Sequence, residues 1–98
     1  MLCVVVRFVI KAGHDASFLE RTVQQSVETL RHEPECRQFD VCIDPADSHR
    51  ILLYEIYASE VAFGQHLLTS HFRAFDAETS GWVEEKTVER WRKVERVP

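Results

Sequence analysis

The sequence contains few of the residues that interrupt helices and strands or crosslink a chain. Its 98 residues include three glycines, three prolines and three cysteines, and no low-complexity segment, long linker or internal repeat is present. No CxxC motif occurs. Cys36 and Cys42 are expected on one strand, roughly 20 Å apart, whereas a disulfide needs Cα atoms within about 7 Å. We therefore expect reduced thiols without special reactivity.

Long apolar runs and a strong excess of one charge are also missing. No run approaches the ~20 residues of a membrane span, and Met1–Arg7 lack the basic start and cleavage site of a signal peptide. We therefore expect a cytoplasmic protein with no membrane partner. The net charge of −4 and the pI near 5.7 argue against a nucleic-acid partner, as does the absence of an RNP aromatic-basic motif.

What remains is the composition of an ordinary globular domain, 45% hydrophobic and 29% charged, so we expect one domain over residues 1–98. Hydrophobic periodicity and turn residues predict the order β-α-β-β-α-β. The expected strands cover residues 2–10, 36–43, 50–58 and 85–94. The first expected helix follows a turn at residues 11–15 and runs to about His32, and the other two cover residues 59–67 and about 70–82. The capping residues Thr69-Ser70 divide the second helical region into the last two of these helices.

The first helix carries an apolar stripe of the kind that faces a core. Its members are Leu19, Val23, Val27 and Leu30, with Ser26 beside them. Ser17 and Glu20 have the spacing of a capping box, although Asp15 is an equal candidate for the cap. Pro34 ends this helix.

This order of elements predicts the α+β ferredoxin-like fold, an antiparallel sheet with helices on one face. Residues 2–10 and 51–57 carry apolar side chains on both faces of their strands. The helix-free face therefore needs a cover, and a second copy of the chain is the simplest one. We expect a homodimer.

Two histidines are the main chemical candidates. His66 lies in a helix that Ser59 can cap, and His71 follows the second cap at Thr69 or Ser70. Histidine suits proton transfer because its unperturbed pKa is ~6.5, although either residue could equally be structural. A break at Thr69-Ser70 could bring the two imidazoles together, but no HExxH or Cys/His ligand spacing occurs, so we expect no metal.

Polar and aromatic residues on neighbouring elements could complete a substrate site. Tyr54 and Tyr57 point to opposite faces of their strand, so one could bind substrate while the other packs. Glu55 and Asp40 could orient an imidazole or bind a substrate hydroxyl, or equally form ion pairs across the sheet or dimer. Phe63 and Phe72 could wall a pocket, although core packing is the more common role of such residues.

Several segments together resemble the antibiotic biosynthesis monooxygenase domain, over nearly the whole chain. They are Leu53-Tyr54-Glu55-Ile56-Tyr57, Ala62-Phe63 with His66, Thr69-Ser70-His71-Phe72, Phe39-Asp40-Val41 and Trp82-Val83-Glu84-Glu85-Lys86-Thr87-Val88. The chain looks most like small quinol-monooxygenase-like members and the isomerase that processes phosphorylated autoinducer-2. The resemblance implies a dimeric α+β barrel and chemistry without metal, flavin or haem. Many members have Trp where this chain has Tyr57, so a stacking role of that Trp transfers only in part.

These observations favour a cofactor-independent monooxygenase acting on a small quinol-like aromatic substrate. His66 and His71 are the catalytic candidates. The candidate substrate-binding residues are Tyr54, Tyr57, Glu55, Asp40, Phe63 and Phe72. One alternative is an isomerase of a small, phosphorylated or unphosphorylated hydroxy-ketone, although no Gly-rich loop or basic cluster stands ready to hold phosphate. Another is a non-catalytic dimer, which a collapsed cavity with both histidines outside it would indicate.

Overall fold

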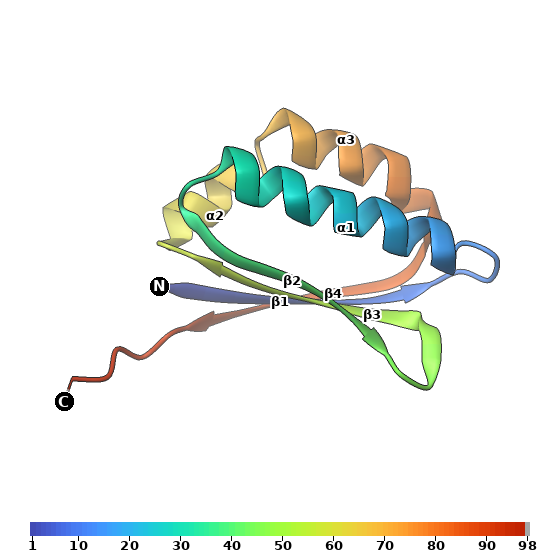
Figure 1. The fold of residues 1–98 in the computed structure, drawn as a ribbon, viewed down its shortest axis with the longest axis horizontal. Helices are drawn as coiled ribbons and strands as arrows, with labels where there is room; N and C mark the ends of the chain where they lie inside the picture. The colour runs from blue at the N-terminus through green and yellow to red at the C-terminus, as the bar shows by residue number, and fades with distance from the viewer. Residues whose placement is uncertain (98) are drawn as a thin grey trace.

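Four antiparallel strands form a single sheet in a computed structural model that describes residues 1–97. The strands are β1 (Leu2–Ile10), β2 (Cys36–Asp44), β3 (Asp47–Tyr57) and β4 (Val83–Arg92). Their order across the sheet is β2-β3-β1-β4 (Figure 1). This sheet confirms the expected ferredoxin-like α+β class.

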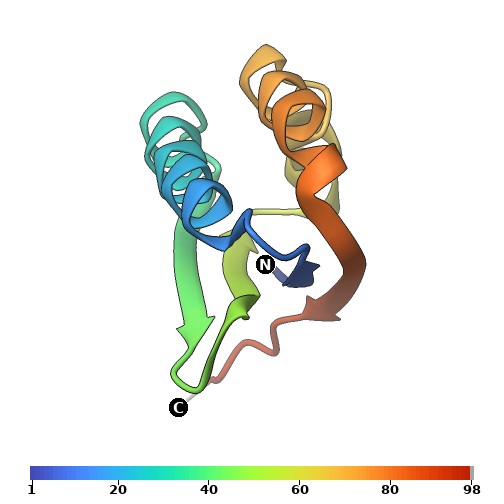
Figure 2. The same cartoon turned by 90° about the vertical axis from the view of Figure 1, so that its right-hand side faces the viewer.

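Helices cover one face of the sheet only. They are α1 (Asp15–His32), α2 (Glu60–His66) and α3 (Ser70–Thr79), and the 3-10 turn η1 (Ser80–Trp82) leads into β4. Figure 2, which looks along the strands, shows α1 and α3 side by side above the sheet and no helix below it. Among the described residues no helix is long and apolar enough to cross a membrane.

The break between α2 and α3 lies where the sequence predicts it, because two capped helix starts follow each other closely. The Ser59 hydroxyl accepts a hydrogen bond from the Ala62 amide, and the Thr69 hydroxyl accepts one from the Phe72 amide. Each cap satisfies an amide that has no partner within its own helix. The break makes the observed order β-α-β-β-α-α-β.

The start of α1 differs from the expected capping box. His14 is the N-cap residue and makes no side-chain cap hydrogen bond. The Asp15 carboxylate instead accepts a hydrogen bond from the Ser48 hydroxyl at 2.6 Å. Gly13, at φ +84°, makes the turn that leads from β1 into the helix, a conformation that other residues adopt at a cost.

Side chains alternate along the two central strands as a two-sided sheet requires. In β1 the even-numbered residues from Leu2 to Ile10 are buried against the helices, and in β3 the odd-numbered residues from Ile51 to Tyr57 are buried likewise. Val4 pairs with Glu55, and Val6 pairs with Leu53. Glu55 therefore points into the layer between sheet and helices.

The buried face of α1 is mostly polar, and here the sequence-based stripe is wrong for three of its four apolar members. Val23, Val27 and Leu30 are 45–46% exposed. Leu19, the first member of the expected stripe, is half-buried and packs against the core. Apart from Phe18, the buried residues of the helix are all polar. They are Thr22, Gln25, Ser26 and Thr29. Several of these groups bond within the helix: the Thr29 hydroxyl donates to the Gln25 carbonyl and the Ser26 hydroxyl to the Val23 carbonyl. Such local bonds lower the cost of burying hydroxyls, so hydrophobicity alone does not identify the inner face.

Phe18 is the apolar anchor of α1. It is fully buried, with its ring centroid 4.9 Å from that of Phe8 on β1 and 6.2 Å from that of Phe75 on α3. One side chain thus joins the sheet and both long helices.

We expect Phe18→Ala to lower the free energy of unfolding by about 3–5 kcal/mol, the usual loss for a buried aromatic side chain. Val27→Ala should change it by about 0.5 kcal/mol or less, because this position is half exposed. Urea denaturation of both variants measures the difference. Comparable losses in the two variants would show that the exposed stripe contributes to the core after all.

Candidate active site

The site is built around a carboxylate at the C-terminal end of α1. Glu33 is the C-cap residue, with φ −119° and ψ 92°, and its amide bonds the Thr29 carbonyl. The following Pro34 disfavours helical geometry at the preceding residue. The sequence Glu33-Pro34 therefore ends the helix and leaves the Glu33 side chain near the break between α2 and α3.

Both candidate histidines approach the same oxygen of this carboxylate. His66 Nδ1 lies 2.8 Å from Glu33 Oε2, and His71 Nε2 lies 2.7 Å from it. The two imidazole centroids are 5.9 Å apart. His66 is buried, whereas His71 and Glu33 are half-buried. The break between α2 and α3 at Thr69 thus brings the two imidazoles together, as the sequence suggested.

The hydrogen bond to Glu33 fixes the tautomer of His66. A carboxylate accepts, so Nδ1 carries the proton and Nε2 has a free lone pair. Nε2 has no hydrogen-bond partner within residues 1–97. Burial lowers the pKa of His66, and the Glu33 carboxylate opposes this effect. The ring is therefore a neutral acceptor held in one orientation.

Aromatic rings surround His66 on several sides. The centroids of Phe72, Tyr57, Phe63 and Phe39 lie 5.1, 5.4, 6.1 and 6.4 Å from that of the imidazole. A carboxylate-oriented imidazole inside an apolar shell is an arrangement that can accept a proton from a bound molecule.

His71 has a second contact, from the polar face of α1. The Gln25 side-chain nitrogen lies 3.0 Å from His71 Nδ1 and 3.4 Å from the Thr29 hydroxyl. Gln25 Oε1 and His71 Nε2 are buried without a hydrogen-bond partner. His71 Nε2 therefore lies close to Glu33 Oε2 at an angle that does not suit a hydrogen bond.

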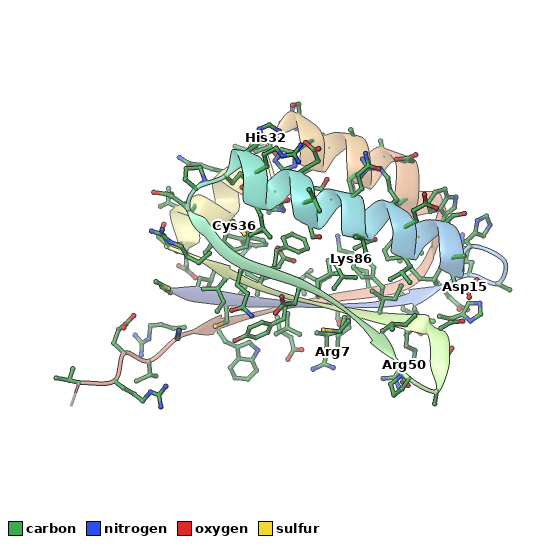
Figure 3. The ribbon with its side chains drawn as sticks, viewed as in Figure 1. Arg7, Asp15, His32, Cys36, Arg50 and Lys86 are labelled. Carbon is green, nitrogen blue, oxygen red and sulfur yellow. The ribbon has the colours of Figure 1, made fainter. Side chains whose placement is uncertain are left out.

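A cavity of about 40 Å³ lies between the helices and the sheet beside His66, large enough for a few water molecules. Its walls come from all the layers. They are Val6, Phe8, Gln25, Phe39, Leu53, Glu55, Phe63, His66, Leu67, Phe72, Phe75, Lys86 and Val88. Lys86 points into the space between sheet and helices (Figure 3), with Nζ 5.7 Å from the centroid of the Phe8 ring. Lys86 and Val88 are exposed and belong to the edge strand β4, so this wall of the cavity borders the surface of the molecule.

A second proton-transfer group lies in the cavity wall. Glu55 is 3% exposed, and its Oε1 accepts a hydrogen bond from the Tyr57 hydroxyl at 2.5 Å. Burial raises the pKa of Glu55 to about 7, and the Tyr57 hydrogen bond opposes that rise. Burial also raises the pKa of Tyr57, so the phenol remains a donor. The cavity therefore holds a carboxyl group that can carry a proton at neutral pH.

The structure gathers most of the candidate residues around this cavity. His66, Glu55, Phe63 and Phe72 line it. Tyr57 contacts three of them, and His71 reaches it through Glu33.

Tyr54 and Asp40 are not part of this group. They pair with each other across β3 and β2 and lie on the helix-free face, because their positions are out of phase with Glu55 and Phe39. Asp40 is exposed and accepts a hydrogen bond from the Gln38 amide. Of the two tyrosines, Tyr57 is therefore the one near the histidines.

Three residues of the site, Glu33, Gln25 and Lys86, were not predicted from the sequence. Glu33 carried a signal, a carboxylate directly before a helix-ending proline. Gln25 belonged to a polar series at helical spacing that was masked by the neighbouring valines. Nothing in the charged run around Lys86 distinguishes it from solvent-facing neighbours.

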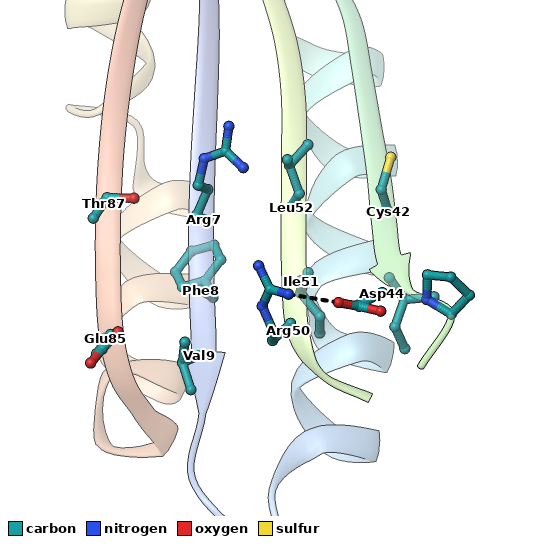
Figure 4. Close-up of a pocket in the computed structure, with 12 residues that line it drawn as sticks. Arg7, Phe8, Val9, Cys42, Asp44, Arg50, Ile51, Leu52, Glu85 and Thr87 are labelled. Atoms are coloured by element: carbon teal, nitrogen blue, oxygen red, sulfur yellow. Dashed lines mark hydrogen bonds and ion pairs between the residues drawn. The ribbon is translucent and has the colours of Figure 1, made fainter. Parts of the chain in front are cut away.

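A much larger hollow than this cavity lies elsewhere in the molecule. It has a volume of about 580 Å³ and lies over the helix-free face, bordered by Arg7, Leu52, Cys42 and Thr87 (Figure 4). Figure 4 also shows the Arg50–Asp44 ion pair, 2.8 Å, at its end. The hollow is open and contains no histidine, so we place the chemistry on the other side of the sheet.

The thiols are free, as expected. Cys36 is buried, and burial raises the pKa of its thiol to about 12. A thiol in this state is a poor nucleophile.

A ferredoxin-like sheet with an acid–base cavity under its helices defines a small α+β domain suited to binding a small molecule. The family model of antibiotic biosynthesis monooxygenases matches residues 1–78. The chain belongs to this family. No curated protein matches it.

Solved structures show the same fold. A protein from Nitrosomonas europaea superposes with a TM-score of 0.91 at 23% identity, covering 97% of this chain and 100% of the other. One from Caulobacter crescentus gives 0.90 at 21% identity, covering 96% and 90%. One from Deinococcus radiodurans gives 0.88 at 18% identity, covering 100% and 97%. All three are named as candidate antibiotic biosynthesis monooxygenases, and at these identities the similarity establishes the fold.

Glu55 should make stability depend on pH. Its pKa is about 7 in the folded protein, against an ordinary 4.5, so between these values the folded state binds more protons than the unfolded state. The free energy of unfolding should therefore fall as the pH rises from about 4.5 to 7, by up to about 3 kcal/mol at ~1.4 kcal/mol per pKa unit. Urea denaturation across this range measures it.

Glu55→Gln is the matched control, since the amide oxygen still accepts from Tyr57 but does not titrate. The variant should lose this part of the pH dependence. An identical slope in both proteins would show that Glu55 titrates normally.

Proposed function

We propose that this protein is a cofactor-independent monooxygenase of small quinol-like aromatic substrates, with His66 as the base. The observation that carries the proposal is the free His66 Nε2 in an aromatic cavity, with Nδ1 held by Glu33 at 2.8 Å. Family membership supports the oxygenase class.

The proposed reaction begins with removal of a phenolic proton by His66 Nε2. The resulting anion is electron-rich enough to reduce O₂ directly, giving a peroxide bonded to a ring carbon. Cleavage of its O–O bond leaves one oxygen on the ring and releases the other as water. A quinol plus O₂ thus becomes a hydroxyquinone plus water, with atoms and electrons balanced.

Each neighbouring group has a role in this scheme. The Glu33 carboxylate stabilises the imidazolium that forms at His66, and His71 positions that carboxylate. Glu55 exchanges protons with the second oxygen of the substrate, while Tyr57 orients Glu55.

Phe63 and Phe72 contact the substrate ring, and the positive charge of the Lys86 ammonium group stabilises the substrate anion. The cavity is small as it stands, so substrate entry requires side chains such as Phe72 and Lys86 to move.

Isomerisation of a small hydroxy-ketone is the second candidate. The presence of two proton-transfer groups in one cavity, His66 and Glu55, favours it, because such a reaction needs a base and an acid. The aromatic walls favour the quinol. A non-catalytic binder is less well supported, because His66 is buried and His71 is half-buried.

We also propose that two copies of the chain associate through the helix-free face. In a single chain this face leaves Trp91 59% exposed, and Val5, Val9 and Leu52 of the same face are half-buried. Tyr54 and Asp40 would then lie at the interface rather than in the substrate cavity. A stable interface would bury about 1,600 Å² in total.

Replacing the base should remove most of the activity. Substrates are first found by screening quinols and hydroxy-ketones for oxygen uptake and isomerisation, with and without chelator. On a substrate that is turned over, we expect His66→Ala to lower the rate about 10²–10⁴-fold, and His71→Ala and Glu33→Gln to lower it less. Turnover should persist in chelator.

His49→Ala is the control for these variants, because His49 lies on β3 beside Asp15 and Asp47 and away from the cavity. Near-full activity of both His66→Ala and His71→Ala would refute the proposed base. Turnover of hydroxy-ketones without oxygen uptake would select the isomerase instead.

The dimer is tested with Leu52→Glu, which places a charge at the centre of the proposed interface but on a partly exposed surface in a single chain. We expect light scattering at micromolar concentration to give a dimer for the wild type and a monomer for this variant. Val27→Glu, on the exposed face of α1, should remain dimeric. A monomeric wild type would contradict the proposal.

A further inference from the structure

Three metal-ligand side chains converge at the C-terminal end of α1. One ligand atom from each of Glu33, His66 and His71 lies within 4.8 Å of the other two, and among the described residues this is the one such group of three. We propose that these residues form a binding site for a divalent first-row transition-metal ion, such as Zn²⁺, Co²⁺ or Ni²⁺. The ligands would be Glu33 Oε2, His66 Nδ1 and His71 Nε2.

The donor types select this class of ion. Two imidazoles and one carboxylate suit zinc, cobalt, nickel and iron, whereas Mg²⁺ and Ca²⁺ prefer shells made of oxygen alone. Metal–ligand bonds of ~2.0–2.1 Å put the ligand atoms of a tetrahedral site about 3.3 Å apart. Glu33 Oε2 now lies 2.8 and 2.7 Å from the two nitrogens, so it needs to retreat by only about half an ångström.

Two buried atoms without hydrogen-bond partners, His71 Nε2 and Gln25 Oε1, give the proposal further support. His71 Nε2 makes no hydrogen bond although it faces Glu33 at 2.7 Å. An unpaired buried nitrogen is costly to maintain, and a metal ion would satisfy it. Only the deprotonated nitrogen binds a metal, so the proton would move to His71 Nδ1.

Gln25 provides the acceptor that this tautomer needs. Metal-bound histidines commonly donate their other N–H to a carbonyl or carboxylate. Gln25 is 2% exposed, its amide nitrogen lies 3.0 Å from His71 Nδ1, and its Oε1 has no partner. A half-turn of the amide presents Oε1 to the Nδ1–H. The second layer of the site is thus already in place.

Metal binding would also change the chemistry of His66. A metal ion on Nδ1 leaves the remaining proton on Nε2, the atom that faces the substrate in the proposed mechanism. His66 then donates a hydrogen bond and no longer accepts a proton. The ion would therefore inhibit the oxygenase reaction, a consequence that rests on the proposed function, whereas binding itself does not.

The test uses the full-length protein freed of metal by chelator and then titrated with Co²⁺, followed by its visible absorption and by calorimetry. We expect one ion per chain and a raised melting temperature. Glu33→Gln and His71→Gln should lose the absorption. Gln25→Ala should weaken binding about 10–100-fold, as removal of a group that orients a ligand does. Circular dichroism confirms that each variant is folded.

His49→Ala is the control, because His49 lies between two surface carboxylates, Asp15 and Asp47, that could bind an ion by themselves. It should bind Co²⁺ as the wild type does. No binding by the wild type, or binding that survives in Glu33→Gln and His71→Gln and is lost in His49→Ala, would overturn the proposed site.

Activity provides a separate readout. Where a substrate is known, Zn²⁺ at the concentration that saturates the site should lower turnover at least tenfold, and chelator should restore it. Full activity of the zinc-loaded protein would refute His66 Nε2 as the base while leaving the metal site standing. Absence of binding would refute the metal site while leaving the base standing.

Discussion

The shared contact of two imidazoles with Glu33 Oε2 joins parts of the chain that are otherwise independent. Glu33 ends α1, His66 ends α2 and His71 lies in the first turn of α3. A half-buried carboxylate between two imidazoles has little freedom, because each departure leaves a polar group without a partner in a poorly solvated place. Helix packing, the orientation of His66 and the shape of the cavity therefore depend on one another.

The polar underside of α1 follows from the same arrangement. Thr22, Gln25 and Thr29 would be poor choices if this helix only closed a hydrophobic core. Gln25 contacts both Thr29 and His71, so hydrogen bonds of these polar residues hold His71 of the site against α1. The ion pair between Arg21 and Glu78 holds α1 against α3 at the outer edge of the same layer.

The sequence was sufficient for the sheet, because alternation along residues 51–57 determines which side chains share a face. It was also sufficient for the break at Thr69, because a capping hydroxyl acts on the amide three residues later. Both rules act between residues close together in the chain.

The sequence was misleading for α1. Val23, Val27 and Leu30 have the spacing of a core stripe but are exposed, whereas two hydroxyls of the inner residues form hydrogen bonds within the helix. The sequence did not show that Glu33 and Gln25 contact the two histidines. The contacts from Glu33 to His66 and from Gln25 to His71 join residues 33 and 46 positions apart, and they exist only in the folded chain.

The short link between α2 and α3 determines the distance between the two imidazoles. Leu67, Leu68 and Thr69 are the residues between His66 and the start of α3. The pairing of the strands does not depend on how many residues this link contains. A residue gained or lost there would rotate one imidazole away from the other and leave the strand register untouched. Loop length at this point therefore offers a route by which relatives with the same fold can acquire different chemistry without any exchange of catalytic side chains.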